Sequence, residues 1–267
     1  MSPLDLDPAA AIWVAIAMFV LWLFSVAIRD ASIVDVFWGL GFVLIAAIAN
    51  DPAGYELRQA IVGLLVSLWG IRLAVHLSLR NRGKGEDARY QAMRKRWGAR
   101  FPVVSLVQVF VLQGVLMLVV SSPLQAAMQL PSASLTPLDV LGALICAAGI
   151  AFEAIGDLQL TRFKAKRGNA KKVMDQGLWR YTRHPNYFGD CVMWWGFGLI
   201  ALGAGAWWAL AGPLVMTVLL LRVSGVTLLE RRMAKTRPGY TEYARRTSSF
   251  FPMPPRKTVS EPTKEPV

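Results

Sequence analysis

The densest group of residues able to do chemistry lies in the segment GLWRYTRHPNYFGDCVMWWG. Arg183 and His184 stand directly before Pro185, which favours extended backbone ahead of it and the start of a helix after it. Asn186 and Asp190 follow four residues apart and therefore share one face of that helix. Arginines at a helix N-terminus can bind phosphate, and a histidine can act there as a general acid or hydrogen-bond donor. A basic membrane flank explains the arginines alone, but not the amide and acid set among them.

Ionisable residues inside apolar stretches form a second group of candidates, because charge within a membrane is expensive. Asp35 lies near the start of the second apolar stretch, and Arg72 and His76 lie four apart on one face of the third. Others occur in later stretches: Glu153, Asp157, Asp190, Arg222 and Glu230. Two interpretations stay open. These residues pair internally, for example Asp35 with Arg72, or they line a cytoplasmic crevice where an anionic cofactor meets a lipid-dissolved substrate.

Two further segments combine charge with tyrosine. The segment LRNRGKGEDARYQAMRKRWG sets Glu86, Asp87 and Tyr90 among basic residues, and it is equally typical of an interfacial helix on anionic lipid. The segment at 228–252 contains Tyr240 and Tyr243, which could stack on an aromatic ring. Both segments are candidates to border the crevice.

The elements that must position these residues are membrane helices, each of which needs about 20 mostly apolar residues. The chain is 55% hydrophobic and only 17% charged, against about 25% charged residues in a soluble domain. Seven stretches qualify as spans: Ala10–Ile28, Ile33–Ala49, Ala60–Leu79, Val103–Met128, Leu138–Leu160, Tyr187–Leu202 and Trp207–Leu229. We therefore expect an all-α integral membrane protein, a seven-transmembrane-helix bundle.

The distribution of Lys and Arg predicts the orientation. The loops at 80–100 and 162–183 hold eight each and the tail after Leu229 holds nine, whereas 129–137 has none and 50–59 only Arg58. The positive-inside rule then places the N-terminus outside and the C-terminus in the cytoplasm. The net charge of +12 lies in these loops, so it indicates membrane topology, and we expect no nucleic-acid partner.

The expected organisation is one membrane domain with short ends. Residues 1–9 form an external N-terminal segment, acidic and without the features of a cleaved signal peptide. The membrane domain covers 10–254, with a cofactor half at about 138–254, and 255–267 is a disordered cytoplasmic tail.

Several motifs are missing from the sequence. There is no GxGxxG after a strand and no GxxxxGK[ST], so a nucleotide site would not be of the Rossmann or P-loop type. There is no HExxH, and with two histidines and no cysteine cluster we expect no metal. Cys146 and Cys191 fall in apolar stretches and are interpreted as buried thiols.

The motif RYTRHPNYFGD, with GLW before it and the 230–252 tail after it, resembles the C-terminal domain of the steroid 5-alpha-reductases. The segments DVFWG and RNRGKGEDARY extend the resemblance to the bacterial DUF1295 branch of that superfamily. The resemblance implies a seven-helix fold that holds NADPH between the last helices and the cytoplasmic loops. It also implies hydride transfer to a carbon–carbon double bond of a steroid-like lipid in the bacterial inner membrane.

Carried over by position, the resemblance implies a set of cofactor-binding residues. With their ionisable or aromatic neighbours in the same motifs, these are Asn81, Arg82, Asp157, Lys164, Tyr181, Arg183, His184, Asn186, Tyr187, Asp190, Glu230 and Tyr243.

The substrate side departs from that pattern. In steroid reductases a glutamate of the second helix and a tyrosine of the third bind the substrate carbonyl. Asp35 can stand for the glutamate, but Ala60–Leu79 contains no tyrosine, so we expect Arg72 or His76 to take its place. Asp35, Arg72 and His76 are therefore the predicted catalytic residues.

Two other functions stay open. The isoprenylcysteine carboxyl methyltransferases, which use S-adenosylmethionine, have a similar RHPxYxG motif and tyrosine-rich tail. NADPH is the expected cofactor because its several phosphate charges suit the basic loops better than S-adenosylmethionine, which has none. A non-catalytic membrane protein that retains the fold is the third hypothesis.

Overall fold

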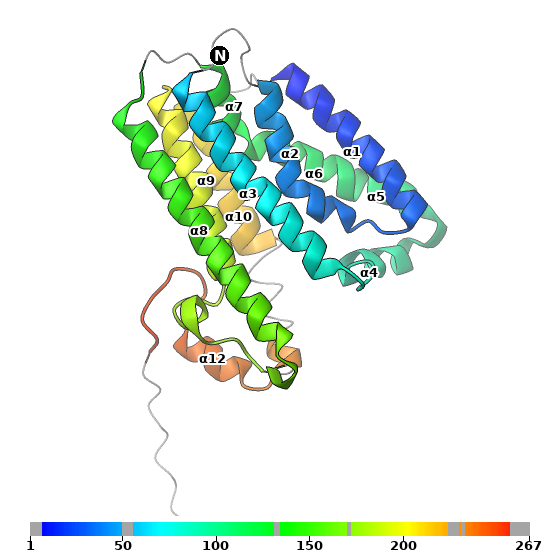
Figure 1. Cartoon of the computed structure of the whole chain (residues 1–267). Helices are drawn as coiled ribbons and strands as arrows, with labels where there is room; N and C mark the ends of the chain where they lie inside the picture. Colours follow the sequence, from blue (N-terminus) through cyan, green and yellow to red (C-terminus); the bar gives the residue numbers. More distant parts are fainter. Residues whose placement is uncertain are drawn as a thin grey trace, which may run out of the picture. The chain divides into compact units, whose positions relative to one another are not determined.

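The structure, a computed structural model, describes residues 7–49, 56–130, 134–169, 172–223, 230 and 233–256. It is all-helical over these residues, apart from an isolated bridge between Thr182 and Ser248 (Figure 1). The chain divides into two compact units. Unit 1 comprises Met1–Ala147 and Trp194–Met216, and unit 2 comprises Ala148–Met193 and Thr217–Val267. The domain boundaries expected at residues 9, 138 and 254 stay predictions.

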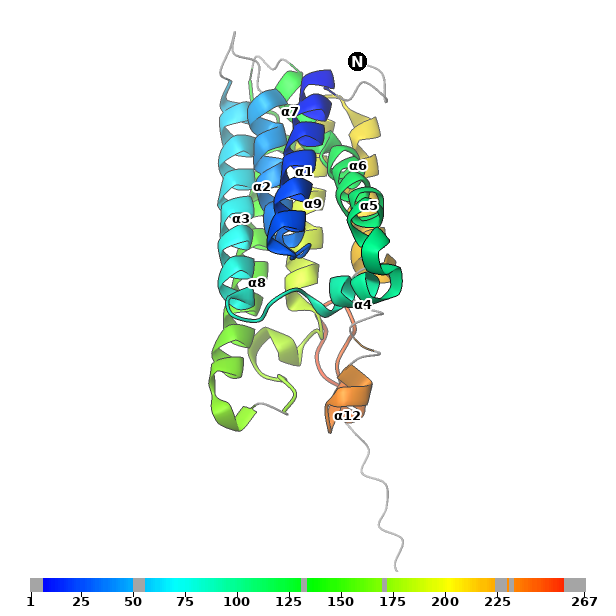
Figure 2. The same ribbon diagram turned by 90° about the vertical axis from the view of Figure 1, so that its right-hand side faces the viewer.

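Unit 1 begins with three apolar helices that lie side by side in both views (Figures 1 and 2). The Asp7 side chain caps the first helix by accepting a 2.9 Å hydrogen bond from the backbone N–H of Ala9. The helices of this part are α1 (Pro8–Ile28), α2 (Ile33–Ala49), α3 (Leu57–Asn81), α4 (Ala88–Trp97), α5 (Phe101–Ser105), α6 (Leu112–Val120) and α7 (Ser122–Gln129). A π-helical segment, Leu106–Val111, joins α5 to α6.

Glycines let α2 and α3 approach to backbone contact. A Cβ atom built on Gly39 lies 2.6 Å from the Gly70 carbonyl oxygen, so neither position has room for a side chain. Beside this contact Phe42 packs its ring against Trp69 and Trp194, with ring centroids 5.7 and 4.7 Å away. The helix pair therefore has a fixed spacing near the polar residues of α2.

Four helical stretches are long and apolar enough to cross a membrane: Pro8–Ile28, Leu57–Asn81, Ala88–Val120 and Pro137–Ala165. Ile33–Ala49 and Trp207–Arg222 are shorter apolar helices. Large apolar side chains are exposed along α1, including Trp13, Phe19 and Phe24, as expected where a helix faces lipid. The chain is thus an all-helical membrane protein, while the count of seven spans and the orientation stay predictions.

Two predicted spans are interrupted. Val103–Met128 is wrong as one helix, because α6 ends at Val120 and α7 starts at Ser122. Pro123 has no N–H to donate one turn back, and this ends the ladder of hydrogen bonds. Trp207–Leu229 is also not one regular helix over its described part. It consists of a 3₁₀ turn (Trp207–Leu210), α10 (Ala211–Val218) and a π-helical segment (Leu219–Val223), and 224–229 lie outside the described residues.

Unit 2 is built on the second half of α8 (Pro137–Ala165) and the first turns of α9 (Pro185–Gly203). Gly149 and Gly189 bring the two helices together, since a Cβ on Gly149 lies 2.6 Å from the Gly189 carbonyl oxygen. A 3₁₀ turn (Gly177–Arg180) precedes α9, and α12 (Tyr240–Arg246) follows near the C-terminus. Both cysteines are buried thiols, as predicted.

Candidate functional site

The start of α9 is placed by its packing on α8 within unit 2. Gly156 leaves room for it, because a Cβ there lies 3.3 Å from the backbone nitrogen of Asn186. The Asn186 side-chain amide then donates a 3.3 Å hydrogen bond to Asp157. Asp190, one turn further along α9, is buried. The polar face predicted from the spacing of Asn186 and Asp190 therefore meets an acid of α8.

The segment before α9 is tied to the segment after α12. The Thr182 hydroxyl donates to the Phe250 carbonyl at 2.7 Å, and the Arg183 backbone N–H donates to the Ser248 carbonyl at 2.9 Å. The buried Tyr243 hydroxyl donates to the Trp179 carbonyl at 2.5 Å. These contacts join residues more than sixty positions apart and fix the wall of a cavity.

That cavity has a volume of about 300 Å³ and is bordered by α8, the segment before α9 and α12. None of its described lining residues is acidic, whereas its cationic lining residues are Lys164, Lys172, Arg183 and Arg237. Aromatic rings of Phe163, Trp179, Tyr240 and Tyr243 also line it. A pocket with four cations and four aromatic rings suits a ligand that carries both phosphate and a flat ring.

A buried histidine of the cavity wall contacts a glutamate. His184 is only 2% exposed, and its Nε2 lies 3.2 Å from Oε1 of Glu230. Arg183 pairs with the same carboxylate oxygen at 2.9 Å, so the negative charge of Glu230 is compensated locally. The His184 ring stacks on Tyr187, with ring centroids 5.5 Å apart. Because the carboxylate favours a proton on Nε2, the other ring nitrogen can accept a hydrogen bond while the ring is neutral.

The two tyrosines of α12 present neutral hydroxyl groups. Burial, with the nearby negative charge of Glu230, raises the pKa of Tyr240 to about 12. Burial also raises the pKa of Tyr243 above its usual value. Both phenols therefore keep their protons at neutral pH and add no negative charge to a site suited to anions.

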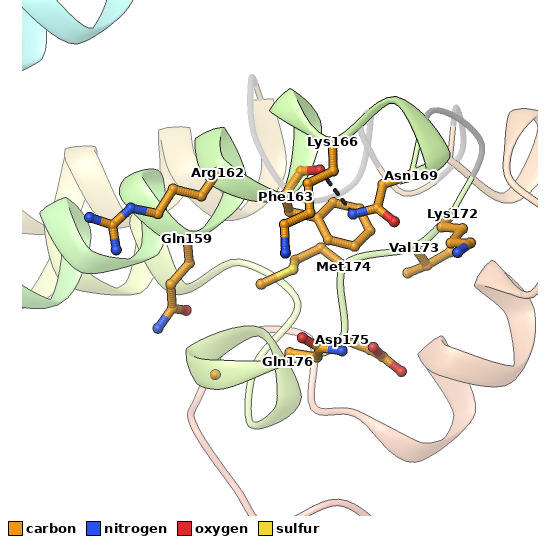
Figure 3. A pocket seen from close by; sticks show the side chains of 11 residues that line it. Gln159, Arg162, Phe163, Lys166, Asn169, Lys172, Val173, Met174, Asp175 and Gln176 are labelled. Carbon is orange, nitrogen blue, oxygen red and sulfur yellow. Dashed lines mark hydrogen bonds between the residues drawn. The ribbon is translucent and has the colours of Figure 1, made fainter.

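A second cavity, of about 530 Å³, adjoins the first and shares Phe163, Asn169, Lys172, Val173 and Met174 with it. Figure 3 shows Lys166 and Asn169 beside it. The Asn169 side-chain amide donates a 3.0 Å hydrogen bond to the Phe163 carbonyl. Asp175 also lines it, but that carboxylate is bound by Arg246. An extended anionic ligand has room in the two adjoining cavities, since small-molecule sites measure about 300–1,000 Å³.

A separate polar site lies in unit 1, around Asp35 at the start of α2. The Tyr90 hydroxyl donates to Oδ1 of Asp35 at 2.8 Å, and the Arg89 guanidinium contacts Oδ2 at 2.5 Å. The Gln113 amide lies 3.3 Å from the same phenol oxygen. An acid, a phenol and a guanidinium thus form one cluster between α2 and α4.

Acidic residues before α4 hold this helix in place. Glu86 binds the Arg94 guanidinium through both carboxylate oxygens, at 2.7 and 2.9 Å, and accepts from the backbone N–H of Ala31. Burial opposes ionisation, but these hydrogen bonds outweigh it and lower the pKa of Glu86 below its ordinary 4.5. Asp87 caps α4 and binds Arg89 at 2.9 Å. The position of Tyr90 is therefore defined by ion pairs at both ends of α4.

The structure brings together much of the predicted cofactor set. Lys164, Arg183, His184 and Tyr243 line the cavity of unit 2, and Glu230 and Tyr187 contact residues of its wall. Asn186 and Asp157 are hydrogen-bonded to each other in the same unit. Tyr181 is 43% exposed and does not line the cavity. Asn81 and Arg82 belong to unit 1, where Asn81 ends α3 and Arg82 caps it. Arg72 and His76 lie half-buried on α3, and their catalytic role stays a prediction.

Sequence reasoning missed two features of these sites. One hypothesis paired Asp35 with Arg72, whereas the structure gives Asp35 two partners from α4, Arg89 and Tyr90. Trp179, Lys172 and Arg237 of the cavity wall were not singled out either. The segment RNRGKGEDARY contained the signal for Tyr90, but no spacing rule connects it to a residue 55 positions earlier.

The fold and these sites define a helical membrane protein with a cation-lined cavity and a half-buried acid–phenol cluster. A family model described as "Protein of unknown function (DUF1295)" matches residues 21–247. The chain belongs to this family. Comparison with curated proteins and with solved structures found no match.

Proposed function

We propose that the chain is a membrane reductase of the bacterial inner membrane that uses NADPH to reduce a carbon–carbon double bond of a lipid-soluble, steroid-like substrate. The observation that carries the proposal is the cavity of unit 2, where four cationic side chains meet four aromatic rings and none of the described lining residues is acidic. Lys164, Lys172, Arg183 and Arg237 suit the phosphates of NADPH, and Tyr240 suits a ring. S-adenosylmethionine has no phosphate for these cations to bind.

The chain's own residues supply binding and proton transfer in this proposal. Bound NADPH supplies the hydride. Asn186 and Asp157 offer an amide and a carboxylate for polar groups of the cofactor, with His184 as a further hydrogen-bond partner. In this proposal Tyr90 is the proton donor in place of Arg72 or His76, because its phenol proton can turn from Asp35 to a substrate carbonyl oxygen. Arg89 compensates the charge of Asp35 during that transfer.

The test is ligand-dependent thermal stability of the protein purified in detergent, since a ligand that binds only the folded state raises the melting temperature. NADPH is expected to stabilise, NADH to do so less, and S-adenosylmethionine not at all. Lys172→Gln and Arg237→Gln should each reduce the shift, whereas Arg245→Gln, an exposed cation outside this cavity, should not. A shift with S-adenosylmethionine and none with NADPH contradicts the proposal and favours a methyltransferase, and no shift with any of them favours a non-catalytic protein.

Oxidation of NADPH, followed by its absorbance, extends the test to the reaction. A panel of lipid-soluble enones should accelerate it, and the matched saturated ketones should not. Acceleration by the saturated ketones instead indicates carbonyl reduction and contradicts double-bond reduction.

A further inference from the structure

The short helix α4 lies at a membrane surface. It connects α3 to the segment that contains α5 and α6. The helical stretches Leu57–Asn81 and Ala88–Val120 are each long and apolar enough to cross a bilayer, so the ends that α4 connects lie at the same face of the membrane. With ten residues, α4 is about 15 Å long and carries four cationic side chains, so it does not cross the bilayer itself. Figure 2 shows it across the end of this part of unit 1. Its exposed side chains therefore stand at the depth of lipid headgroups.

The carboxylates near α4 form ion pairs with arginines of the same helix. Glu86 binds Arg94, and Asp87 and Asp35 both bind Arg89. At the other end of α4, Lys95, Arg96 and Arg100 are exposed. Neither Lys95 nor Arg100 has a carboxylate partner among the described residues, and the Arg96 guanidinium lies 5.5 Å from the Trp97 ring. We call Lys95, Arg96 and Arg100 the α4 cationic surface.

The same helix carries the acid–phenol cluster on its buried side. Tyr90 is 6% exposed and bound to Asp35, one and a half turns before the cationic surface begins. Cations beside an interfacial tryptophan are typical of a surface that meets anionic headgroups. A helix of this length is too short to be stable alone, so any contact on one side also stabilises the contacts on the other.

We propose that the α4 cationic surface binds the headgroups of anionic phospholipids in the surrounding bilayer, and that this binding is coupled to the docking of Tyr90 on Asp35. The lipid binds more tightly when α4 is docked, because only then are the three cations held together at headgroup depth. By linkage, bound lipid shifts α4 towards the docked state by the same factor. The proposal concerns lipid binding and does not depend on which reaction the protein catalyses.

The experiment compares hydrogen–deuterium exchange of the full-length protein in nanodiscs of phosphatidylcholine alone and of an equal mixture with phosphatidylglycerol. The anionic lipid should slow exchange of the backbone amides at 88–97. Each cation contributes about fivefold to binding, which corresponds to about 1 kcal/mol per Lys or Arg at the membrane surface. A triple variant, Lys95→Gln/Arg96→Gln/Arg100→Gln, should lose the lipid-dependent slowing. The matched control, Arg162→Gln/Arg167→Gln/Arg245→Gln, removes as many exposed cations from unit 2 and should keep it.

Two further exchange measurements test the coupling to Tyr90 and the identity of the ligand. Tyr90→Phe should also reduce the lipid-dependent slowing of exchange. Without the hydrogen bond to Asp35, part of the free energy of lipid binding is spent on docking α4, so the lipid binds more weakly. Inorganic phosphate added to phosphatidylcholine nanodiscs should have no effect, since the proposed ligand is a lipid. Equal exchange in the two lipids, equal loss in the control variant, or the same slowing by free phosphate each overturns the proposal. A melting curve of each variant verifies that it is folded.

Discussion

The Tyr90 hydroxyl donates a 2.8 Å hydrogen bond to Asp35, although the two residues lie on different helices and 55 positions apart. Asp35 comes from an apolar helix, where an isolated carboxylate is costly, and the phenol and Arg89 together compensate it. A donor and an acceptor held in contact, with a cation beside them, form an arrangement that can deliver a proton to a substrate oxygen.

This contact leads to the first prediction, on turnover. Tyr90→Phe removes the phenol proton and keeps the ring, so NADPH binding should be unchanged while kcat falls about a hundredfold or more, as on loss of a general acid. Asp35→Asn should have a similar effect. The measurements are the NADPH-dependent thermal shift and steady-state NADPH oxidation with an enone substrate. Retention of full turnover by Tyr90→Phe returns Arg72 or His76 to the role of proton donor.

The second prediction concerns pH. The folded-state pKa of Glu86 lies below its ordinary 4.5, so its ion pair stabilises the protein fully above that pH. The contribution is lost as the pH falls below 4.5 through the lower, folded-state value. Glu86→Gln should therefore lower the free energy of unfolding by about 1–2 kcal/mol at neutral pH and by progressively less in acid. Melting curves of both proteins across this pH range measure the difference, and a gap that widens in acid contradicts the assignment.

The third prediction uses the close packing of α8 and α9. A Cβ on Gly189 lies 2.5 Å from the Glu153 backbone nitrogen and 2.7 Å from the Gly149 carbonyl oxygen. Gly189→Ala must therefore push the helices apart, at a cost of about 1–3 kcal/mol, and move Asn186 away from Asp157. Both the melting temperature and the affinity for NADPH should fall.

The control for this variant is Gly168→Ala. A Cβ on Gly168 meets no atom within 4 Å, so the same chemical change should leave stability and cofactor affinity unaltered. An equal loss in both variants means that the helix contact at Gly189 is not what positions Asn186.

The contrast between Asn186 and Tyr90 illustrates what the sequence could predict. The grouping of Asn186, Asp190 and His184 follows from helical periodicity and from the turn before Pro185, which are local rules. The contact between Tyr90 and Asp35 depends on how a short helix folds back against α2, and no local rule encodes that path. Similarly, the apolar stretch at 103–128 satisfies the length of a membrane span, but the proline at 123 ends the helix inside it.

The final prediction concerns a buried ion pair in unit 1. The Arg58 guanidinium binds both carboxylate oxygens of Asp139, at 2.8 and 3.0 Å, and both side chains are about 3% exposed or less. Arg58 was the one cation in the loop predicted to lie outside, and the structure places it in the first turn of α3 with Asp139 as its partner. Arg58→Met leaves the Asp139 carboxylate buried without its cation, and this should lower the free energy of unfolding by about 3–5 kcal/mol.

A second substitution distinguishes loss of the pair from loss of packing. In Arg58→Met/Asp139→Asn the buried charge is gone, while the asparagine oxygen can still accept from the Thr136 backbone N–H, which now donates to Asp139 at 2.7 Å. The double variant should therefore recover much of the stability lost in the single one, because removing one buried charge costs more than removing both. Melting temperatures and denaturant midpoints of the wild type and the variants, including Asp139→Asn alone, complete the cycle. If the double variant is less stable than either single variant, the interaction of Arg58 and Asp139 is not what holds α3 and α8 together at this end of unit 1.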